Sequence, residues 1–442
     1  MKTPKHASLL VLAAGLFAAC GDDDSTGPDE TPAMVQGSVE ETTPAGAGAA
    51  GAPAAAPGTD AEMVAVVQIG ANGTLTTVAE ASTEGDGSYV VNSVTGGLED
   101  LAVVAYVGDR DAGRVLLYES SAAGATIRAA PINYETTAEA RAWSDVRASG
   151  DADATSVSEV SLFLHLSGAE AETLLASEAE IGALAQGLVV AGETMTAVYA
   201  ELGADLDAAA RAEILQEAAI AFSESREGGT SLEATHDAFA DAALDGFGEA
   251  GVTLEETVMA TAAAASTLDA ALDGAVTSRG LVVSEAVRLN LRARERLAAE
   301  DAAGTYGALA GAIEDVHAGT RTTVRGAADA ASVRAALNAN VAAMQNAVVT
   351  AAVQLLAADA SLTVQAAVAS AVQAALTTAR LSTRLEAATD AAAAAAAVGD
   401  YRAGVLAGVQ DMILAAEGAA GEADAEVLTS LFVAASAGAH VR

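Results

Sequence analysis

The apolar residues of this chain change their spacing near residue 134, and this change decides which folds are open to it. Before that point, short runs rich in Val, Ile, Leu, Thr and Tyr are separated by Gly, Asn or Asp: MVAVVQI (63–69), TLTTVAEA (74–81), GSYVVNSV (87–94), LEDLAVVAYV (98–107), RVLLYES (114–120) and ATIRAA (125–130). Such runs are typical of β-strands. From Tyr134 onward the apolar residues follow the period of a helix. The sequence therefore predicts a multidomain β + α chain, in which a small antiparallel β-sandwich precedes a large Ala-rich all-α helical bundle spanning 134–442.

Helix starts in the second part are marked by a Thr or Ser followed three residues later by Glu. The pairs are Thr136 with Glu139, Ser156 with Glu159, Ser167 with Glu170, Thr230 with Glu233, and Thr253 with Glu256. In such a capping box the hydroxyl and the carboxylate bond the free backbone N–H groups at a helix start. Together with the glycines that follow the apolar stripes, these starts predict about eight to ten helices.

The first residues have the pattern of an export signal. Lys2 and Lys5 precede an uncharged apolar stretch, 7–19, which ends directly before Cys20. A stretch of about a dozen residues is too short to cross the roughly 30 Å core of a bilayer, so a cleaved signal peptide over 1–19 is expected. The following segment, 20–32, is acidic and has too few apolar residues to fold, which predicts a tether.

The segment FAAC at 17–20 resembles the lipobox of bacterial lipoprotein precursors. The resemblance implies cleavage before Cys20, a diacylglycerol thioether on its sulfur, and a fatty acid such as palmitate on the new amino group. Two or more acyl chains anchor a protein stably. The cysteine is followed by Gly21 and then Asp22. In this respect the chain is similar to lipoproteins that are released to the outer membrane, and differs from those that are retained by an Asp directly after the cysteine. We expect a protein of the cell envelope held to the membrane by lipid; the alternative is an ordinary secreted protein with an unpaired thiol.

Two short motifs in the β part resemble a known module. QGSV at 36–39 and EGDGSYVV at 84–91 are similar to the opening strand and the turn and strand of carboxypeptidase regulatory-like (transthyretin-like) β-sandwich modules. The predicted module covers 33–132, with a flexible loop at 41–60 that is rich in Ala, Pro, Gly and Thr. Modules of this kind support folding, spacing or binding, so the resemblance implies no catalytic residue.

The stretch 335–379 lacks charge almost completely. No Asp, Glu, Lys or Arg occurs between Arg334 and Asp359, or between Asp359 and Arg380. A helix without charge on any side is typical of a helix surrounded by others, so we expect a buried central hairpin. A membrane hairpin is the alternative, although its many amide side chains oppose it. A third interpretation is a surface for a protein partner or for self-association, where small Ala side chains permit close contact.

Acidic residues outnumber basic ones so strongly that nucleic acid is excluded as a partner. The chain has 60 Asp and Glu against 21 Lys and Arg, a formal net charge of −39. Such a charge repels phosphates and anionic lipid surfaces. The basic cluster Arg288, Arg292, Arg294 and Arg296 is expected to form a solvated helix face that pairs with the protein's own carboxylates, and a docking patch is the alternative.

Two Glu-x-x-His pairs and two separate carboxylates provide candidate metal ligands. They are Glu233 with His236, Glu314 with His317, Glu201 and Glu285. Residues three apart on a helix project together, and ferritin-like di-iron bundles combine two such pairs with a Glu from each of two further helices. The alternative function is therefore a metal-binding helical bundle, acting as an oxidoreductase or metal store. Against it, Glu233 also belongs to a predicted capping box, and His236 shares an apolar stripe with Phe239 and Phe247, as a core histidine would.

Familiar enzyme motifs do not occur. The sequence has no phosphate-binding Gly-x-x-x-x-Gly-Lys loop, no Gly-x-Ser-x-Gly elbow and no Cys-x-x-Cys pair, and Cys20 is its one cysteine. We therefore expect no catalytic residue and no cofactor besides the covalent lipid on Cys20. The predicted function is that of a non-enzymatic, lipid-anchored envelope lipoprotein with a binding or scaffolding role.

Overall fold

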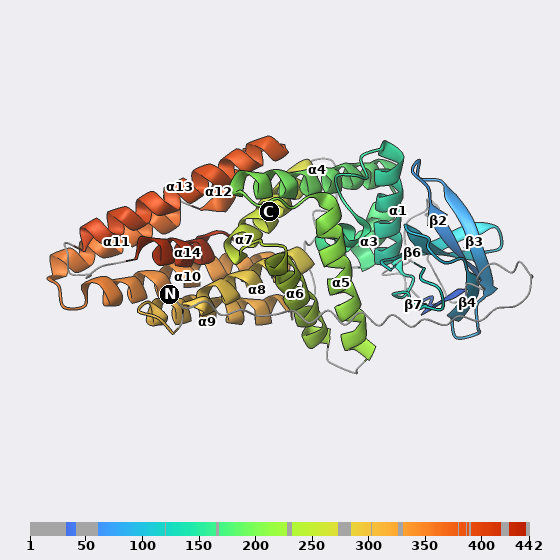
Figure 1. Ribbon diagram of the computed structural model, residues 1–442, viewed down its shortest axis with the longest axis horizontal. Coiled ribbons are helices and arrows are strands. Elements are labelled where there is room, and N and C mark those ends of the chain that lie inside the picture. Colours follow the sequence, from blue (N-terminus) through green and yellow to red (C-terminus); the bar gives the residue numbers. More distant parts are fainter. Residues whose placement is uncertain are drawn as a thin grey trace, which may run out of the picture.

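The computed structural model describes residues 32–40, 61–119, 121–164, 168–227, 232–272, 284–301, 303–325, 330–378, 380–385, 387–388, 390–416 and 424–438. The predicted signal peptide, the loop 41–60 and all but the last residue of the tether lie outside these ranges. The described part is elongated, with β-strands at one end and helices over the rest (Figure 1). The predicted order of a small β part followed by a large helical part is confirmed.

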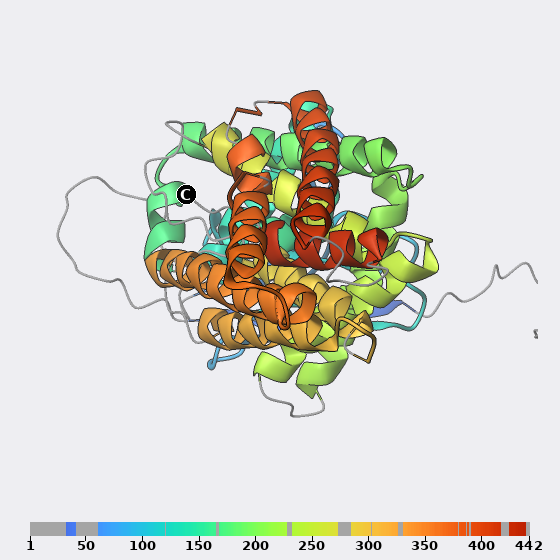
Figure 2. The same cartoon turned by 90° about the vertical axis from the view of Figure 1, so that its left-hand side faces the viewer.

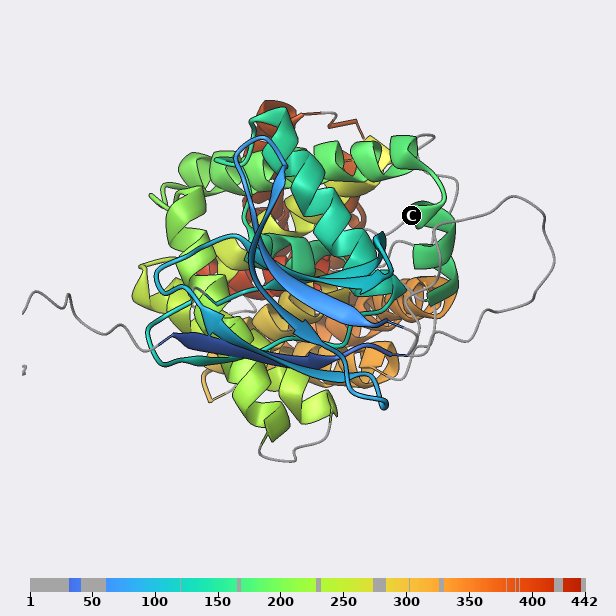
Figure 3. The same ribbon diagram turned by 90° about the vertical axis from the view of Figure 1, so that its right-hand side faces the viewer.

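Two β-sheets form the end of the molecule that faces the viewer in Figure 3. Their strands are β1 (Ala33–Ser38), β2 (Met63–Ile69), β3 (Leu75–Ser82), β4 (Ser88–Val94), β5 (Leu101–Val107), β6 (Arg110–Leu117) and β7 (Thr126–Arg128). One sheet has the order β4-β1-β7 and the other β3-β2-β5-β6. Neighbouring strands are antiparallel except β1 and β7, which are parallel. Each apolar run in the sequence overlaps one strand of β2 to β7.

The central strands of the four-stranded sheet are buried on both faces, which explains their nearly unbroken apolar sequences. On β2, Val64 and Val66 join a buried cluster that contains side chains of both sheets. The alternate residues Ala65 and Val67 join the core of the helical part, which includes Trp143. Because successive side chains of a strand point to opposite faces, this sheet lies between the three-stranded sheet and the helices.

The helical part contains more helices than the eight to ten expected. They are α1 (Tyr134–Ser149), α2 (Val157–Phe163), α3 (Gly168–Leu175), α4 (Glu178–Leu202), α5 (Ala208–Glu227), α6 (Leu232–Glu249), α7 (Leu254–Leu272), α8 (Ser284–Glu300), α9 (Gly307–Arg325), α10 (Ala330–Ala357), α11 (Leu362–Thr378), α12 (Leu381–Leu385), α13 (Ala391–Ala415) and α14 (Ala425–Ser436). The short helices α2, α3 and α12, of 7, 8 and 5 residues, account for most of the difference, because they are too short to show a helical period in the sequence.

Three of the predicted capping boxes lie within the described residues. At the start of α2 only the first half of the predicted box is present: the hydroxyl of Ser156 accepts a hydrogen bond from the backbone N–H of Glu159, whereas the Glu159 carboxylate bonds Arg211. At Thr253 both hydrogen bonds of the box are present. The third prediction is wrong, because α1 begins one turn earlier: its N-cap is Asn133, which exchanges hydrogen bonds of 3.0 Å with Thr136.

Helix α4 packs against α1, α7 and α13. Helices α8, α9 and α10 lie side by side along one flank. Helices α10, α11 and α13 form the end of the molecule opposite the strands, and Figure 2 shows this end from outside. The predicted central hairpin, α10 and α11, is thus at the periphery.

Candidate functional site

Some of the predicted site residues lie outside the part that the structure describes. Cys20, the predicted lipid attachment point, precedes the first described residue. Glu233 falls in α6, but its side chain is not among those described. The remaining candidates can be placed.

The histidine of the first Glu-x-x-His pair lies against a carboxylate of α8. The Nδ1 atom of His236 is 2.7 Å from Oε1 of Glu285, and the Arg288 side chain bonds the same carboxylate. The ring of His236 also packs against Phe222, with 5.3 Å between the ring centres. Burial alone would raise the pKa of Glu285, but the neighbouring His236 and Arg288 hold this pKa below its ordinary value. The group is a compact ion-pair cluster at the contact of α6 with α8.

The histidine of the second pair is occupied by hydrogen bonds inside the core. His317 is completely buried, and its Nε2 atom lies 2.9 Å from the backbone oxygen of Ala434 in α14. The side-chain amide of Asn340 lies 3.4 Å from Nδ1 and also donates to Thr320. Burial, and then the charge of Arg294, lower the pKa of His317 well below its ordinary value. His317 is therefore a neutral residue that joins α9 to α10 and α14.

The structure does not gather the predicted metal ligands into one group. Among the residues that it describes, no three His, Cys, Asp or Glu side chains lie close enough to hold a metal ion. Two of the predicted ligands, His236 and Glu285, meet each other, but His317 is engaged with α14 and α10. Glu201 is exposed and lies beside Gly399 of α13.

The basic cluster of α8 divides between two faces of the helix. Arg292 and Arg296 bond Asp241 of α6 at 2.7 and 2.9 Å, and Arg288 pairs with Glu285, as predicted. Arg288 and Arg294 contradict the prediction of a solvated face, because they are 9% and 3% exposed. Residues four apart share one side of a helix, whereas Arg294 stands two positions from its neighbours in this series and points into the core.

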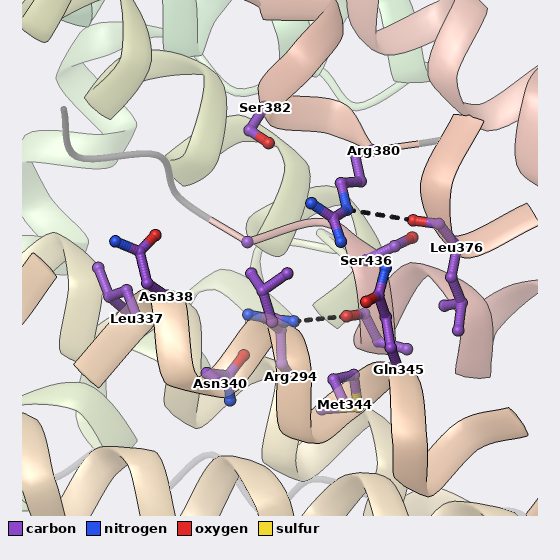
Figure 4. A pocket seen from close by; sticks show the side chains of 13 residues that line it. Arg294, Leu337, Asn338, Asn340, Met344, Gln345, Leu376, Arg380, Ser382 and Ser436 are labelled. Carbon is purple, nitrogen blue, oxygen red and sulfur yellow. Dashed lines mark hydrogen bonds between the residues drawn. The ribbon is translucent and has the colours of Figure 1, made fainter. Parts of the chain in front are cut away.

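A pocket that the sequence did not indicate lies between α8, α10, α14 and the junction of α11 with α12 (Figure 4). The pocket is partly open to solvent, and its volume is about 60 Å³. Arg294 and Arg380 line it together with polar side chains, which include Asn338, Gln345 and Ser436. Among the described residues that line it, there is no Asp or Glu. No motif connects these positions, and only the fold brings them together.

A second feature is the exposed side of α10 and α11, which we name the uncharged surface. It consists of Ala335, Asn338, Ala339, Val341, Ala342, Ala343, Asn346, Thr350, Gln354, Leu362, Thr363, Ala366, Ala367, Ser370, Gln373, Ala374 and Thr377. The expectation that both helices are surrounded by others is wrong, since each packs on one side and leaves the other side open. Alanine accounts for this: it favours helix strongly and exposes little apolar area.

Within the part of the chain that the structure describes, three apolar segments are long enough to cross a membrane, as judged by length and composition. They are Glu178–Leu202, Ser332–Ala357 and Leu362–Leu385. In the first, 61% of the most apolar window is buried in the fold, so packing around α4 explains its composition. The corresponding shares for the second and third are 33% and 25%, and these two segments carry the uncharged surface.

In comparisons with known proteins, no family model, curated protein or solved structure matches the chain.

Proposed function

We propose that the protein is a lipid-anchored lipoprotein of the cell envelope, at the outer membrane, with a non-catalytic scaffolding role in which its uncharged surface binds a second copy of the chain. The observation that carries the proposal is this surface, which spans α10 and α11 at the end of the molecule away from the strands (Figure 2). Three arguments support it.

The first argument is the placement of the anchor. The lipobox-like segment at 17–20 supports acylation of Cys20. The first described strand, β1, begins at Ala33, so the sheets follow the predicted anchor and tether directly along the chain. Two sheets whose side chains share one buried cluster support a regulatory-like β-sandwich module, which would act as a spacer between the tether and the helical part.

The second argument is electrostatic. With a formal net charge of −39, two copies of the chain repel each other over most orientations. The uncharged surface is free of Asp, Glu, Lys and Arg, so its approach to the same surface of another copy avoids this repulsion and removes no charge from water. A two-fold axis would place α10 and α11 of one copy against the same helices of the other.

The third argument is steric and hydrophobic. Most exposed positions on α11 are Ala, Ser or Thr, which allow helices to approach closely. Leu362 is 83% exposed at the start of α11, and Leu414 is 73% exposed near the end of α13. Large apolar side chains exposed at one end of a molecule favour association.

Cross-linking in intact membranes tests the association. Because Cys20 is the one cysteine of the chain and lipidation consumes its thiol, single cysteines can be introduced at exposed positions. Ala343→Cys and Ala367→Cys should give dimers with a short bis-maleimide, whereas Val90→Cys on β4, where Val90 is 46% exposed, is the matched control and should not. Equal yields of cross-linked dimer at all three positions would contradict self-association through this surface. The absence of cross-linked dimer at Ala343→Cys and Ala367→Cys would contradict it as well.

Labelling tests the anchor separately. Cells fed radioactive palmitate should label the wild-type chain, and Cys20→Ala should abolish the label and leave the precursor uncleaved. Persistent labelling of Cys20→Ala would refute lipidation at this residue.

A further inference from the structure

The pocket of Figure 4 carries two arginines without a carboxylate partner. Elsewhere in the helical part, several arginines that lie against neighbouring helices have an acidic partner; for example, Arg211 has Glu159 and Arg321 has Asp237. Within the described residues, neither Arg294 nor Arg380 forms a salt bridge. In a chain with 60 acidic residues, two unpaired guanidinium groups in one pocket need an explanation.

The hydrogen bonds of these arginines neutralise part of their charge. Arg294 donates from Nε to the backbone oxygen of Ala434 and from Nη2 to that of Ala435, at 2.6 and 2.8 Å, which caps the end of α14. Arg380 donates from Nε to the oxygen of Leu376 at 3.3 Å, at the end of α11. The C-terminus of a helix carries roughly half a negative charge, so two helix ends offset about one of the two positive charges. About one positive charge remains in the pocket.

The remaining positive charge is permanent near neutral pH. Burial lowers the pKa of Arg294 to about 10, which still leaves the guanidinium protonated at pH 7. The neighbouring His317 is kept neutral by burial and by the charge of Arg294, so it adds no positive charge and offers no anion. The site is therefore suited to one negative charge.

Arg380 has the donors that such an anion requires. Its Nε atom is used, but the four N–H groups of its two terminal nitrogens have no partner among the described residues. Figure 4 shows the guanidinium groups of Arg380 and Arg294 both directed toward the middle of the residues drawn. A planar guanidinium binds a carboxylate through two parallel hydrogen bonds, which is the strongest of its pairing modes.

The size and walls of the pocket limit the ligand further. A cavity needs a volume of roughly 10–15 Å³ to hold one water molecule, which has one non-hydrogen atom. The pocket volume of 60 Å³ therefore corresponds to a ligand of about four to six non-hydrogen atoms. Leu337, Met344 and Leu376 form apolar wall, while Gln345 and Ser436 provide polar groups. A ligand with one charged end and a short apolar end matches this lining better than a symmetrical phosphate does.

We propose that the pocket between α8, α10, α14 and the α11–α12 junction binds a small monocarboxylate of about two to four carbons, with Arg380 holding the carboxylate bidentately and Arg294 supplying a fixed positive charge. Ligand binding there does not require self-association, although the lining residues Asn338 and Val341 also belong to the uncharged surface. Binding of a small organic acid at this site would stabilise the packing of α11 against α10 and α14.

Calorimetric titration of the full purified chain with sodium propionate tests the proposal. Propionamide, which has the same shape without the charge, and inorganic phosphate serve as the comparison ligands. Propionate should bind saturably with a Kd of about 1 mM, while propionamide should not bind. Arg380→Gln should weaken propionate binding roughly tenfold to a hundredfold. Arg380→Lys keeps the positive charge but lacks the two parallel N–H donors of the guanidinium, so it should weaken binding less.

The control variant is Arg402→Gln, because Arg402 is exposed on the neighbouring α13 and pairs with Glu255 at 3.0 Å. It should bind propionate like the wild type. Failure of propionate to saturate the protein, equal binding of propionamide, or unchanged affinity in Arg380→Gln would overturn the site. Tighter binding of phosphate than of propionate would overturn the ligand class. Should Arg380→Gln disturb the helical circular dichroism, the Arg380→Lys titration decides the matter.

Discussion

The contact between Arg211 and Glu159 offers the sharpest test of what holds the helical part together. Both side chains are completely buried, and Nε of Arg211 lies 2.8 Å from Oε1 of Glu159. Arg211 also donates to the hydroxyl of Thr196 at 2.7 Å and to the backbone oxygen of Gly192 at 3.1 Å. One guanidinium thus joins α2, α4 and α5. Gly192 is required at this crossing, because a Cβ there would lie 2.2 Å from the oxygen of Ala154.

Replacing Glu159 with Leu leaves the buried guanidinium without its counter-charge. Removing one partner of a buried ion pair costs about 3–5 kcal/mol, since the remaining charge keeps its desolvation penalty. This is a large fraction of the roughly 5–15 kcal/mol that stabilises a typical fold. At about 2 °C per kcal/mol for a large domain, the melting temperature should fall by about 6–10 °C.

The double variant Glu159→Leu/Arg211→Met separates charge from packing. With both charges absent, the penalty of the lone cation disappears, and the double variant should be more stable than Glu159→Leu alone. The hydrogen bonds that Gly192 and Thr196 lose in the double variant set a limit to this recovery.

Urea unfolding followed by circular dichroism at 222 nm measures these differences. The matched control is Glu178→Ala, because Glu178 is 84% exposed and lies 3.4 Å from Arg141. An exposed pair contributes about 0–1 kcal/mol, so this variant should be nearly unchanged. If Glu159→Leu costs no more than Glu178→Ala, or if the double variant is as unstable as Glu159→Leu, the reasoning from buried charge is refuted.

For three further substitutions, the structure predicts whether the stability of the fold rises or falls. Burial raises the pKa of Glu139 well above its ordinary value, so the folded state binds a proton that the unfolded state releases, and stability falls as pH rises above about 4.5. Glu139→Gln should therefore raise the melting temperature at pH 8 and leave it nearly unchanged at about pH 4. Gly408→Ala should destabilise the fold by about 1–3 kcal/mol, because the new Cβ would lie 2.8 Å from that of Ala375 in α11. Tyr89→Phe should be neutral or stabilising by about 1 kcal/mol, since the buried Tyr89 hydroxyl has no hydrogen-bond partner among the described residues.

Melting curves recorded by circular dichroism check all three. A pH-independent effect of Glu139→Gln would contradict the assignment of a retained proton. Unchanged stability of Gly408→Ala would show that α11 and α13 separate at little cost, and a loss of more than about 1 kcal/mol in Tyr89→Phe would reveal a partner for that hydroxyl.

The coarse fold was accessible from the sequence because its signals are local. Strands such as β2 and β5 can be predicted from apolar runs that lie between turn residues. The starts of α2 and α7 can be predicted from the capping residues Ser156 and Thr253. The start of α1 was misplaced because Asn133 and Thr136 both have capping side chains, and local sequence does not decide which one the chain uses.

Features that depend on tertiary contacts could not be predicted. The absence of charge in α10 and α11 is compatible with burial and equally with an exposed Ala-rich helix, and only the neighbouring helices decide between them. Arg294 stands in a row of arginines, but its partners, Ala434 and Ala435, are 140 and 141 residues away. The pocket near it combines four separate segments, so no linear motif records it.

The position of β1 has a mechanical consequence. This strand is the middle one of its sheet, bonded to β4 on one side and to β7 on the other. It is also the first strand among the described residues, so any tension that reaches the fold through the residues before Ala33 is delivered to β1. A pull along β1 loads the backbone hydrogen bonds of both ladders in shear, so many bonds must break together rather than one after another. Under the proposed anchoring at Cys20, the β end of the molecule would therefore be the part that bears load.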